Sequence, residues 1–288
     1  VYRNHSIDSS FAMGWQRRRS TLASMALGAL VAETSLGVPG EGAFQTLSKN
    51  CATCLGKFDA LHLGHASLAQ RAREDLQMEP CMVSFSGMAE VFGWPARHPL
   101  VAPEHRQEVL KSIGATERVL PFVEVRNLSP KDFVDFLVDV LGASGAVCGE
   151  NFRFGYKAAG DANMLKELGK NRGIPVIIAP LQCSGGIISS TRLREMLRDG
   201  KVKDAAAILG RPHRVLWRHR AATELLEPAN QIPGDGLYQV SLLLKEGVTP
   251  HVATLRVADG RAFLSEIPSD IGTLTDVLFD EGYAAQSV

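Results

Sequence analysis

The feature that most constrains the fold of this chain is a regular alternation of strand-like and helix-like segments between Lys49 and Arg211. Short apolar runs predict strands at residues 51–58, 81–85, 118–125, 145–149 and 174–180. Helical spacing of apolar residues predicts helices at residues 64–77, 103–113, 129–141, 160–173, 190–200 and 202–210. This alternation is typical of an α/β fold with a parallel sheet, in which ligands bind beyond the carboxyl ends of the strands.

The two ends of the chain depart from this pattern. The first 32 residues are rich in Arg and Ser and contain one acid, Asp8, a composition typical of targeting leaders. The C-terminal region contains strand-like runs separated by turn residues. We therefore predict a targeting or disordered leader at residues 1–46, an α/β domain at 47–212 and a small β-rich region at 213–288.

Composition excludes several classes of protein. The 288 residues include 31 Lys and Arg against 31 Asp and Glu, so no basic excess indicates nucleic-acid binding. No apolar run reaches the ~18 residues that a membrane-spanning helix needs. Cys51 and Cys54 form a Cys-x-x-Cys pair, but no second pair stands at zinc spacing. We expect strand cysteines in a reducing compartment rather than a metal or redox site.

His62-Leu63-Gly64-His65 stands where the first predicted strand gives way to a helix. Both imidazoles would then lie at the helix N-terminus, where free N–H groups and the helix dipole attract anions. Gly64 would let a bulky ligand approach the backbone. The pair could donate to phosphate oxygens and stabilise charge that develops in phosphoryl or nucleotidyl transfer. The alternative is two capping or surface histidines.

A second candidate phosphate site opens the helix predicted at residues 190–200. The run "ISSTRLR", residues 188–194, places three hydroxyls and two guanidiniums at a helix start. The helix dipole favours acids at that position, whereas Arg and free N–H groups suit a polyphosphate. A capped surface helix is the alternative, and it leaves the placement of the arginines unexplained.

A third segment, "GENFRFGYKAAGD" at residues 149–161, alternates aromatic residues with Arg153 and Lys157. Beside a phosphate site such aromatics are a candidate platform for a flat ring system, and otherwise they pack the loop. The first strand is not followed by Gly-x-Gly-x-x-Gly, and no P-loop sequence is present. A dehydrogenase or a P-loop enzyme is therefore disfavoured.

Together these segments resemble a known family. "HLGH" and "ISSTRLR" are similar to the paired signatures of the nucleotidylyltransferase superfamily. "GKFDALHLGH", "GENFRFG" and "ISSTRLR", in that order, resemble the adenylyltransferase module of prokaryotic-type FAD synthetases. "SFSGMAEVFGW" and "GENFRFGYKAAGDA" are still more similar to the FAD synthetases of plant and algal plastids. The resemblance runs from about Lys49 to His213.

The resemblance implies a Rossmann-like fold with helices on both faces of the sheet, and transfer of AMP from ATP to FMN in the presence of Mg²⁺. The FMN phosphate is already a nucleophile, so positioning and charge neutralisation would dominate catalysis. The implied catalytic residues are His62, His65 and Arg194. The implied ATP-binding residues are Gly56, Phe58, Asp59, His62, Gly64, His65, Ser189, Ser190, Thr191 and Arg194, and the implied FMN-binding residues are Asn151, Phe152 and Arg153.

The C-terminal region departs from the bacterial members of this family. Their riboflavin kinase barrel opens with Pro-Thr-x-Asn, whereas Pro228-Ala229-Asn230 lacks the threonine. "IPGDGLYQV" still resembles the strand that follows in the kinase. We therefore expect a degenerate kinase-like region without riboflavin kinase activity. With the leader, the resemblance implies a plastid location, and the mitochondrion is the alternative.

Two other functions stay open from the sequence. One is a related His-x-Gly-His transferase with another acceptor, nicotinamide mononucleotide or phosphopantetheine, against which "GENFRFG" argues. The other is a nucleotide- or flavin-binding protein without turnover. In each case we expect small-molecule ligands and neither nucleic-acid nor membrane partners.

Overall fold

A computed structural model of the chain describes residues 46–182, 186–219, 224–243, 250–265 and 274–284. From Ser48 onward the chain is one compact unit. The predicted leader, apart from its last residue, lies outside the described residues. Across the described ranges, no helix combines the length and the apolar character needed to cross a membrane.

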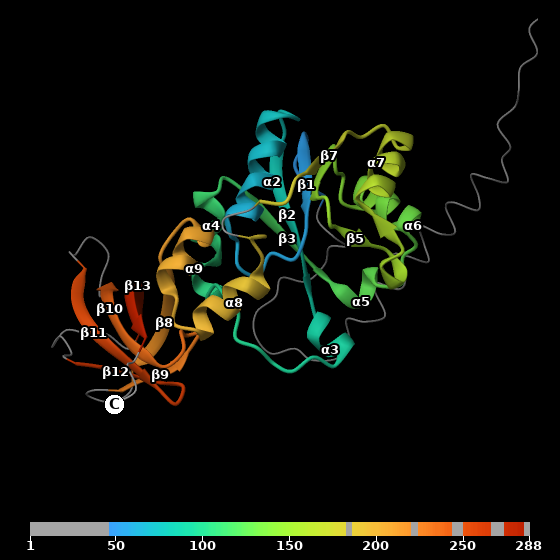
Figure 1. Cartoon of the computed structure of the whole chain (residues 1–288). Helices are drawn as coiled ribbons and strands as arrows, with labels where there is room; N and C mark the ends of the chain where they lie inside the picture. The colour runs from blue at the N-terminus through green and yellow to red at the C-terminus, as the bar shows by residue number, and fades with distance from the viewer. Residues whose placement is uncertain (1–45, 183–185, 220–223, 244–249, 266–273, 285–288) are drawn as a thin grey trace, which may run out of the picture. The chain divides into compact units, whose positions relative to one another are not determined.

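The predicted parallel sheet is confirmed (Figure 1). Its strands lie in the order β3-β2-β1-β4-β7, and each neighbouring pair is parallel. The central strand β1 is buried along its whole length, which explains its small and apolar sequence. The strands are β1 (Cys51–Leu55), β2 (Glu79–Ser86), β3 (Thr116–Pro121), β4 (Gly145–Gly149) and β7 (Val176–Ala179).

Helices flank the sheet on both sides (Figure 1). The strand order reverses at β1, so right-handed crossovers place α2 and α4 on one face and α6 and α7 on the other. Ser129 caps α6 and Pro130 occupies its first turn. The helices are α2 (Leu63–Glu74), α3 (Met88–Phe92), α4 (Arg106–Ser112), α5 (Phe122–Val125), α6 (Pro130–Asp135), α7 (Ala162–Asn171), α8 (Ser190–Arg198) and α9 (Val202–Leu209). Short elements are η1 (Pro103–His105), η2 (Phe136–Val140), β5 (Arg153–Phe154), η3 (Tyr156–Ala158) and β6 (Gly160–Asp161).

One predicted strand is wrong in its second half. The run at residues 118–125 is mostly apolar, but β3 ends at Pro121 and the next four residues form α5. Proline has no N–H to continue a ladder, and its fixed φ suits a helix start. Because β3 is an edge strand, its chain can leave the sheet here without breaking pairing on a second side.

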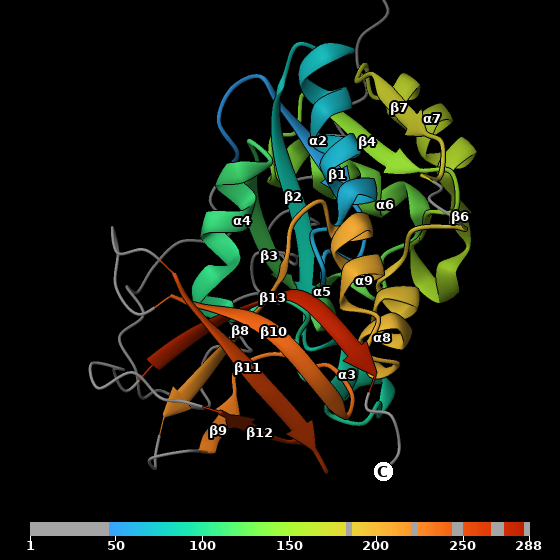
Figure 2. The same cartoon turned by 60° about the vertical axis from the view of Figure 1, so that its left-hand side comes forward.

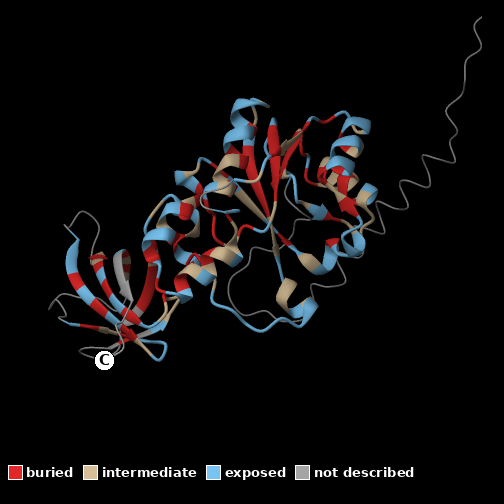
Figure 3. Cartoon of the chain, in the orientation of Figure 1, coloured by how far each residue is buried: buried red, intermediate tan, exposed pale blue. Residues whose placement is uncertain are grey.

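The predicted β-rich C-terminal region is a closed antiparallel barrel. Its strands pair in the order β10-β11-β12-β9-β8-β13, and β13 also pairs with β10. Burial alternates along β10 because one face points into the barrel (Figure 3). The strands are β8 (His213–His219), β9 (Glu224–Pro228), β10 (Gly236–Leu243), β11 (His251–Ala258), β12 (Arg261–Leu264) and β13 (Leu274–Ala284).

Within the compact unit the barrel packs against the α/β part, and Figure 2 shows α9 close to the barrel strands. On β13, Asp276 contacts His105 Nε2 at 2.8 Å and Arg214 Nη2 at 2.7 Å. Arg214 also pairs with Glu108 of α4 at 2.8 Å. Helix α9 contacts β8 and β13, and side chains of α8, α9 and the barrel share one hydrophobic core. The barrel therefore packs against α4, α8 and α9.

Candidate functional site

The carboxyl ends of β1 and β4 meet where the strand order of the sheet reverses. The two strands are paired, with Leu55 opposite Cys148. Ligands of open α/β sheets bind at such a switch point, outside the carboxyl ends of the strands. The segment with the two histidines and the aromatic segment at residues 149–161 therefore leave the sheet side by side.

Helix α2 begins at Leu63, within one residue of the predicted start, and His62 is its N-cap, the role that the sequence analysis left as the alternative. Nδ1 of His62 accepts a hydrogen bond from the backbone N–H of His65 at 3.3 Å. Leu61, directly before the cap, has a φ of 48°, a left-handed conformation that few residues other than glycine adopt. Such strain persists where surrounding contacts hold the backbone in place.

The two imidazoles stack on each other, with ring centroids 3.7 Å apart and planes 14° from parallel. Phe58 meets the ring of His65 edge-on, with centroids 4.9 Å apart. A Cβ at Gly64 would lie 3.1 Å from a ring carbon of His62. Glycine at position 64 therefore leaves room for the first imidazole to stack.

Burial keeps both imidazoles uncharged at neutral pH. Burial, with a smaller contribution from the guanidinium of Arg211, lowers the pKa of His62 from 6.5 to about 4. Burial, the neighbouring imidazole and nearby arginines hold the pKa of His65 well below 6.5. Because Nδ1 of His62 accepts a hydrogen bond, its proton lies on Nε2. Nδ1 of His65 is buried and has no hydrogen-bond partner among the described residues. The pair offers an anion N–H donors rather than cations.

These depressed pKa values make folding stability depend on pH. His62, His65 and the buried His213, whose pKa burial lowers to about 4, are neutral when folded. The unfolded chain binds more protons below about pH 6.5, so acid favours unfolding. We expect the free energy of unfolding to stay level above this pH. Below it, each imidazole should remove up to about 1.4 kcal/mol per pH unit.

Urea denaturation at about pH 7.5 and about pH 5.5 measures this effect. His213→Gln should weaken the pH dependence, because it removes one depressed imidazole. His251→Gln, at an exposed position of β11, is the matched control. Equal stability at the two pH values would contradict the prediction.

Arg211, which sequence reasoning missed, holds the turn before the stacked histidines. Its guanidinium donates to the carbonyl oxygens of Ala60 and Leu61, each at 2.8 Å. Burial lowers the pKa of Arg211 to about 10, so it remains charged at neutral pH. These partners lie 150 and 151 positions earlier in the chain. The local sequence "GRPH" carries no signal of them.

The start of α8 lies against the turn that follows β1. Nη2 of Arg194 donates to Oδ2 of Asp59 at 2.6 Å, although the two residues are 135 positions apart. Behind this ion pair, Ala60 shares a hydrophobic core with Ile188 and Leu193. The two turns for which the sequence predicts phosphate binding therefore meet in space.

The hydroxyls and arginines at the start of α8 have different surroundings. Ser189 is the N-cap, and its Oγ accepts the N–H of Arg192 at 3.2 Å. The Arg192 guanidinium contacts the carbonyl oxygen of Gly186 at 2.7 Å. Ser190 is half-buried and Thr191 is exposed. Arg194 contacts the turn with the histidines through Asp59.

The predicted FMN-side residues are less closely joined to this site. Asn151 follows β4 and is exposed, beside Gly149. Phe152 stacks on Phe154 with centroids 5.7 Å apart. The guanidinium of Arg153 folds back onto the carbonyl oxygen of Ala158 at 2.9 Å. These contacts stay within residues 149–161. This segment lies near the histidines because it follows β4, the strand that pairs with β1.

Four aromatic side chains lie near the carboxyl ends of β2 and β3. The sequence analysis gave this group no role. We call Phe85, Phe92, Trp94 and Phe122 the aromatic cluster. Phe92 stacks on Trp94, with centroids 4.8 Å apart, and contacts Phe122 at 5.3 Å. Trp94 is 44% exposed, and Nζ of Lys57, in the turn after β1, lies 5.4 Å from its ring centroid. Exposed aromatic surface of this kind suits a flat ligand.

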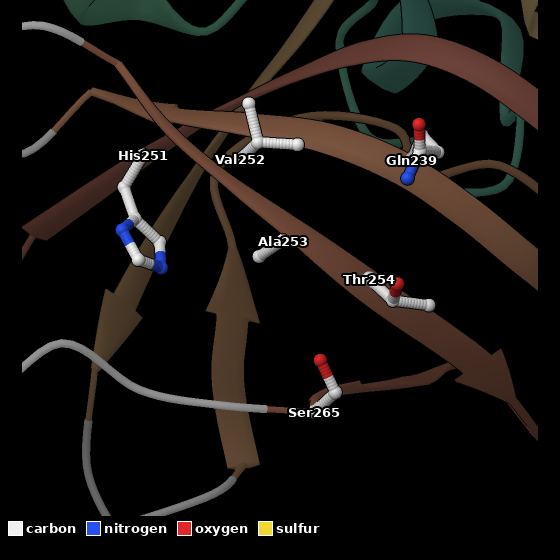
Figure 4. A pocket seen from close by; sticks show the side chains of 6 residues that line it. All are labelled: Gln239, His251, Val252, Ala253, Thr254 and Ser265. Carbon is white, nitrogen blue, oxygen red and sulfur yellow. The ribbon is translucent and has the colours of Figure 1, made fainter.

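Other features of the described chain do not contain predicted site residues. A pocket on the barrel is lined by Gln239, His251, Val252, Ala253, Thr254 and Ser265 (Figure 4). The cysteines of β1, β2 and β4 are buried free thiols, as predicted. In the part of the chain that the structure describes, no cluster of three or more His, Cys, Asp or Glu side chains could hold a metal ion.

Comparison with known proteins indicates the same family as the sequence motifs do. The family model described as FAD synthetase matches residues 44–192. FAD synthetase 1, chloroplastic, of Arabidopsis thaliana is 38% identical in an alignment of 225 positions, which covers 66% of this chain and 63% of that protein. The chain therefore spans less than two thirds of this plant relative.

A bacterial relative covers a larger share of the chain. The bifunctional riboflavin kinase/FMN adenylyltransferase of Pseudomonas fluorescens is 31% identical over 240 residues, 75% of this chain and 77% of that protein. A crystal structure of a macrolide-efflux protein from Streptococcus pneumoniae superposes with a TM-score of 0.72 at 24% identity. It covers 84% of this chain and 88% of that one, and shows that the fold is shared.

Proposed function

The chain belongs to the FAD synthetase family, and on this basis we propose that it is an FMN adenylyltransferase, which transfers AMP from ATP to FMN and releases pyrophosphate. One observation carries the proposal, the ion pair between Asp59 and Arg194. It joins the turn with the stacked imidazoles to the hydroxyl-rich start of α8, two turns that together suit one triphosphate.

In this reaction a phosphate oxygen of FMN attacks the α-phosphorus of ATP. The new P–O bond forms as the bond from the α-phosphorus to the oxygen bridging the β-phosphorus breaks, and pyrophosphate leaves with that electron pair. The nucleophile needs no deprotonation, so positioning and charge stabilisation supply most of the catalysis. Neutral imidazole donors and a fixed guanidinium suit this chemistry.

We assign the catalytic roles accordingly. The Nε2–H of His62, the ring of His65 and the N–H groups at the start of α2 donate to the phosphates as charge develops on them. Arg194 binds the β- and γ-phosphates and then the departing pyrophosphate. The other proposed ATP-binding residues are Gly56, Phe58, Asp59, Gly64, Ser189, Ser190 and Thr191.

The acceptor would lie beside the triphosphate, where the chain leaves the carboxyl end of β4. We propose that Asn151, Phe152 and Arg153 bind FMN. The aromatic cluster supports a flavin as acceptor, because it presents exposed rings next to the turn with the histidines.

Mg²⁺ would enter with the phosphates of ATP and neutralise part of their charge. Asp59 is a carboxylate in the turn after β1, and Mg²⁺ sites on nucleotides need only one or two carboxylates. Both oxygens of Asp59 are already hydrogen-bonded, one to Arg194 and one to the backbone N–H of Leu100 at 3.2 Å. Each oxygen of a carboxylate has a second lone pair, so Asp59 fits a Mg²⁺ ion while it keeps these partners.

We further propose that the barrel has no riboflavin kinase activity. Asn230, the last residue of the degenerate kinase sequence, is fully buried. Its amide oxygen accepts from Leu216, and its amide nitrogen donates to the carbonyl oxygens of Arg214 at 2.9 Å and Leu100 at 3.4 Å. An amide that is satisfied in this way is not available to bind a substrate.

The plant relative supports a plastid location, with a leader at residues 1–46 that would be removed, and the mitochondrion is the alternative. We place the end of the transfer domain at residue 212, directly before β8 begins.

The test is to incubate the purified chain with ATP, Mg²⁺ and FMN, and to separate flavins by chromatography. We expect FAD and pyrophosphate in equal amounts. Riboflavin with ATP should give no FMN, and formation of FMN would refute the loss of kinase activity.

Parallel reactions with nicotinamide mononucleotide and phosphopantetheine test the acceptor. Pyrophosphate release with one of these, and none with FMN, would replace the proposal by another transferase. Binding of ATP or FMN without any product would indicate a non-catalytic protein.

A further inference from the structure

One residue of the C-terminal region contacts the guanidinium that we assign to the triphosphate. Gln231 follows β9, and its Oε1 accepts a hydrogen bond from Nη1 of Arg194. Its Nε2 donates back to the carbonyl oxygen of the same arginine at 3.4 Å. Nη1 also contacts the carbonyl oxygen of His98 at 3.0 Å, while Nη2 faces Asp59. The guanidinium is therefore held by oxygens from three separate segments.

Gln231 is itself held on both sides of its backbone. Its N–H donates to the carbonyl oxygen of Pro99 at 2.8 Å. Its carbonyl oxygen lies 2.7 Å from Nε2 of His213, which is 1% exposed. The adjacent Asn230 is fixed by its three backbone partners. The side chain of Gln231 thus extends from a rigid point of the barrel rather than from a free loop.

A neutral partner has a specific advantage at this position. An arginine side chain carries about 2 kcal/mol of rotamer entropy, so it needs fixed partners to point in one direction. Asp59 supplies one, but a carboxylate also cancels positive charge and competes with an incoming phosphate for the guanidinium. The Gln231 amide fixes Nη1 without cancelling its charge.

We infer that Gln231 is a positioning residue for adenylyl transfer: it orients Arg194 toward the triphosphate, so that the barrel completes the transfer site of its own chain. This inference rests on the proposed function. It gives the barrel a reason to be retained in a chain without riboflavin kinase activity.

The test compares Gln231→Leu with the wild type by steady-state kinetics and by ATP binding in calorimetry. Leucine keeps the approximate volume and removes both hydrogen bonds. We expect kcat/KM for ATP to fall by about ten- to hundredfold, which is the usual loss for a hydrogen bond to a charged group. The KM for FMN should be unchanged. Gln239→Leu, at an exposed position of β10, is the matched control and should behave as wild type.

A double-mutant cycle separates positioning from general damage to the fold. If Gln231 acts through Arg194, then Gln231→Leu should cost little more in a chain that already carries Arg194→Ala. An equal loss in both backgrounds, or wild-type kinetics of Gln231→Leu, would overturn the inference.

If Gln231→Leu does not fold, Gln231→Glu tests the inference in its place. It keeps an acceptor for the guanidinium but adds a charge that competes with ATP, so KM for ATP should rise and the melting temperature should hold. A wild-type KM for ATP would overturn the inference. Absence of FAD formation by the wild type would refute the proposed function instead, so the two failures are distinguishable.

Discussion

Replacing His62 by alanine should lower the kcat for FAD formation by about 10²–10³-fold, the usual loss for a donor that stabilises developing charge. The ring supplies the Nε2–H that we aim at the phosphates, and it stacks on His65. His65→Ala should have a similar effect, because it removes the other half of the stacked pair. Measuring kcat at saturating ATP and FMN tests both variants.

His62 is also the N-cap of α2, so loss of activity must be separated from loss of stability. Alanine at an N-cap costs about 1 kcal/mol, whereas asparagine is a good cap. His62→Asn should therefore melt near the wild-type temperature and remain impaired in catalysis. His251→Ala, at an exposed barrel position, is the matched control. Wild-type turnover of both His62→Ala and His65→Ala would refute the assignment of the histidines.

Replacing Arg194 by alanine should lower kcat/KM for ATP by about 10²–10³-fold, because truncating one member of a hydrogen-bonded charge pair costs about 2–5 kcal/mol. Asp59 would lose its partner, and an unpaired carboxylate would then repel the triphosphate. The effect should be larger for ATP than for FMN, because Arg194 is assigned to the triphosphate and the proposed FMN-binding residues follow β4. Initial rates at varied ATP and fixed FMN measure it.

Arg194→Lys tests geometry separately from charge. An ammonium keeps the positive charge, but it lacks the planar fork that contacts Asp59, His98 and Gln231 together. We expect an activity between that of alanine and that of the wild type. Arg198→Lys is the matched control, since Arg198 lies exposed on the same helix beside Asp199. Equal activity of Arg194→Lys and the wild type would show that the orientation of the guanidinium is unimportant.

Local patterns predicted most of the α/β part correctly. Alternating apolar strands and amphipathic helices identified the parallel sheet, and the predicted helix starts at residues 129 and 190 lie within one residue of the starts of α6 and α8. These features depend on nearest neighbours along the chain, so a sequence displays them directly. The error at residues 118–125 arose because the sequence does not reveal that β3 is an edge strand from which the chain turns away at Pro121.

The barrel was harder to predict. Its β-rich character was visible in the runs that became β10 and β11, but closure depends on β13 pairing with both β10 and β8. Such pairings join residues far apart in the chain, and no local pattern encodes them. The burial of the Asn230 amide was not predictable for the same reason, because its partner Leu100 lies far away along the chain.

The sequence by itself determined which chemical groups the site contains: two imidazoles around a glycine, and hydroxyls with arginines at a second helix start. Only the tertiary structure decided that these imidazoles are stacked, buried and neutral, and that Arg194 faces Asp59. It alone also revealed Arg211 and Gln231, whose partners lie 150 and 37 positions away along the chain. The physical reason is that composition and spacing specify functional groups, whereas burial and distance, which set charge state and orientation, exist only once remote segments have packed together.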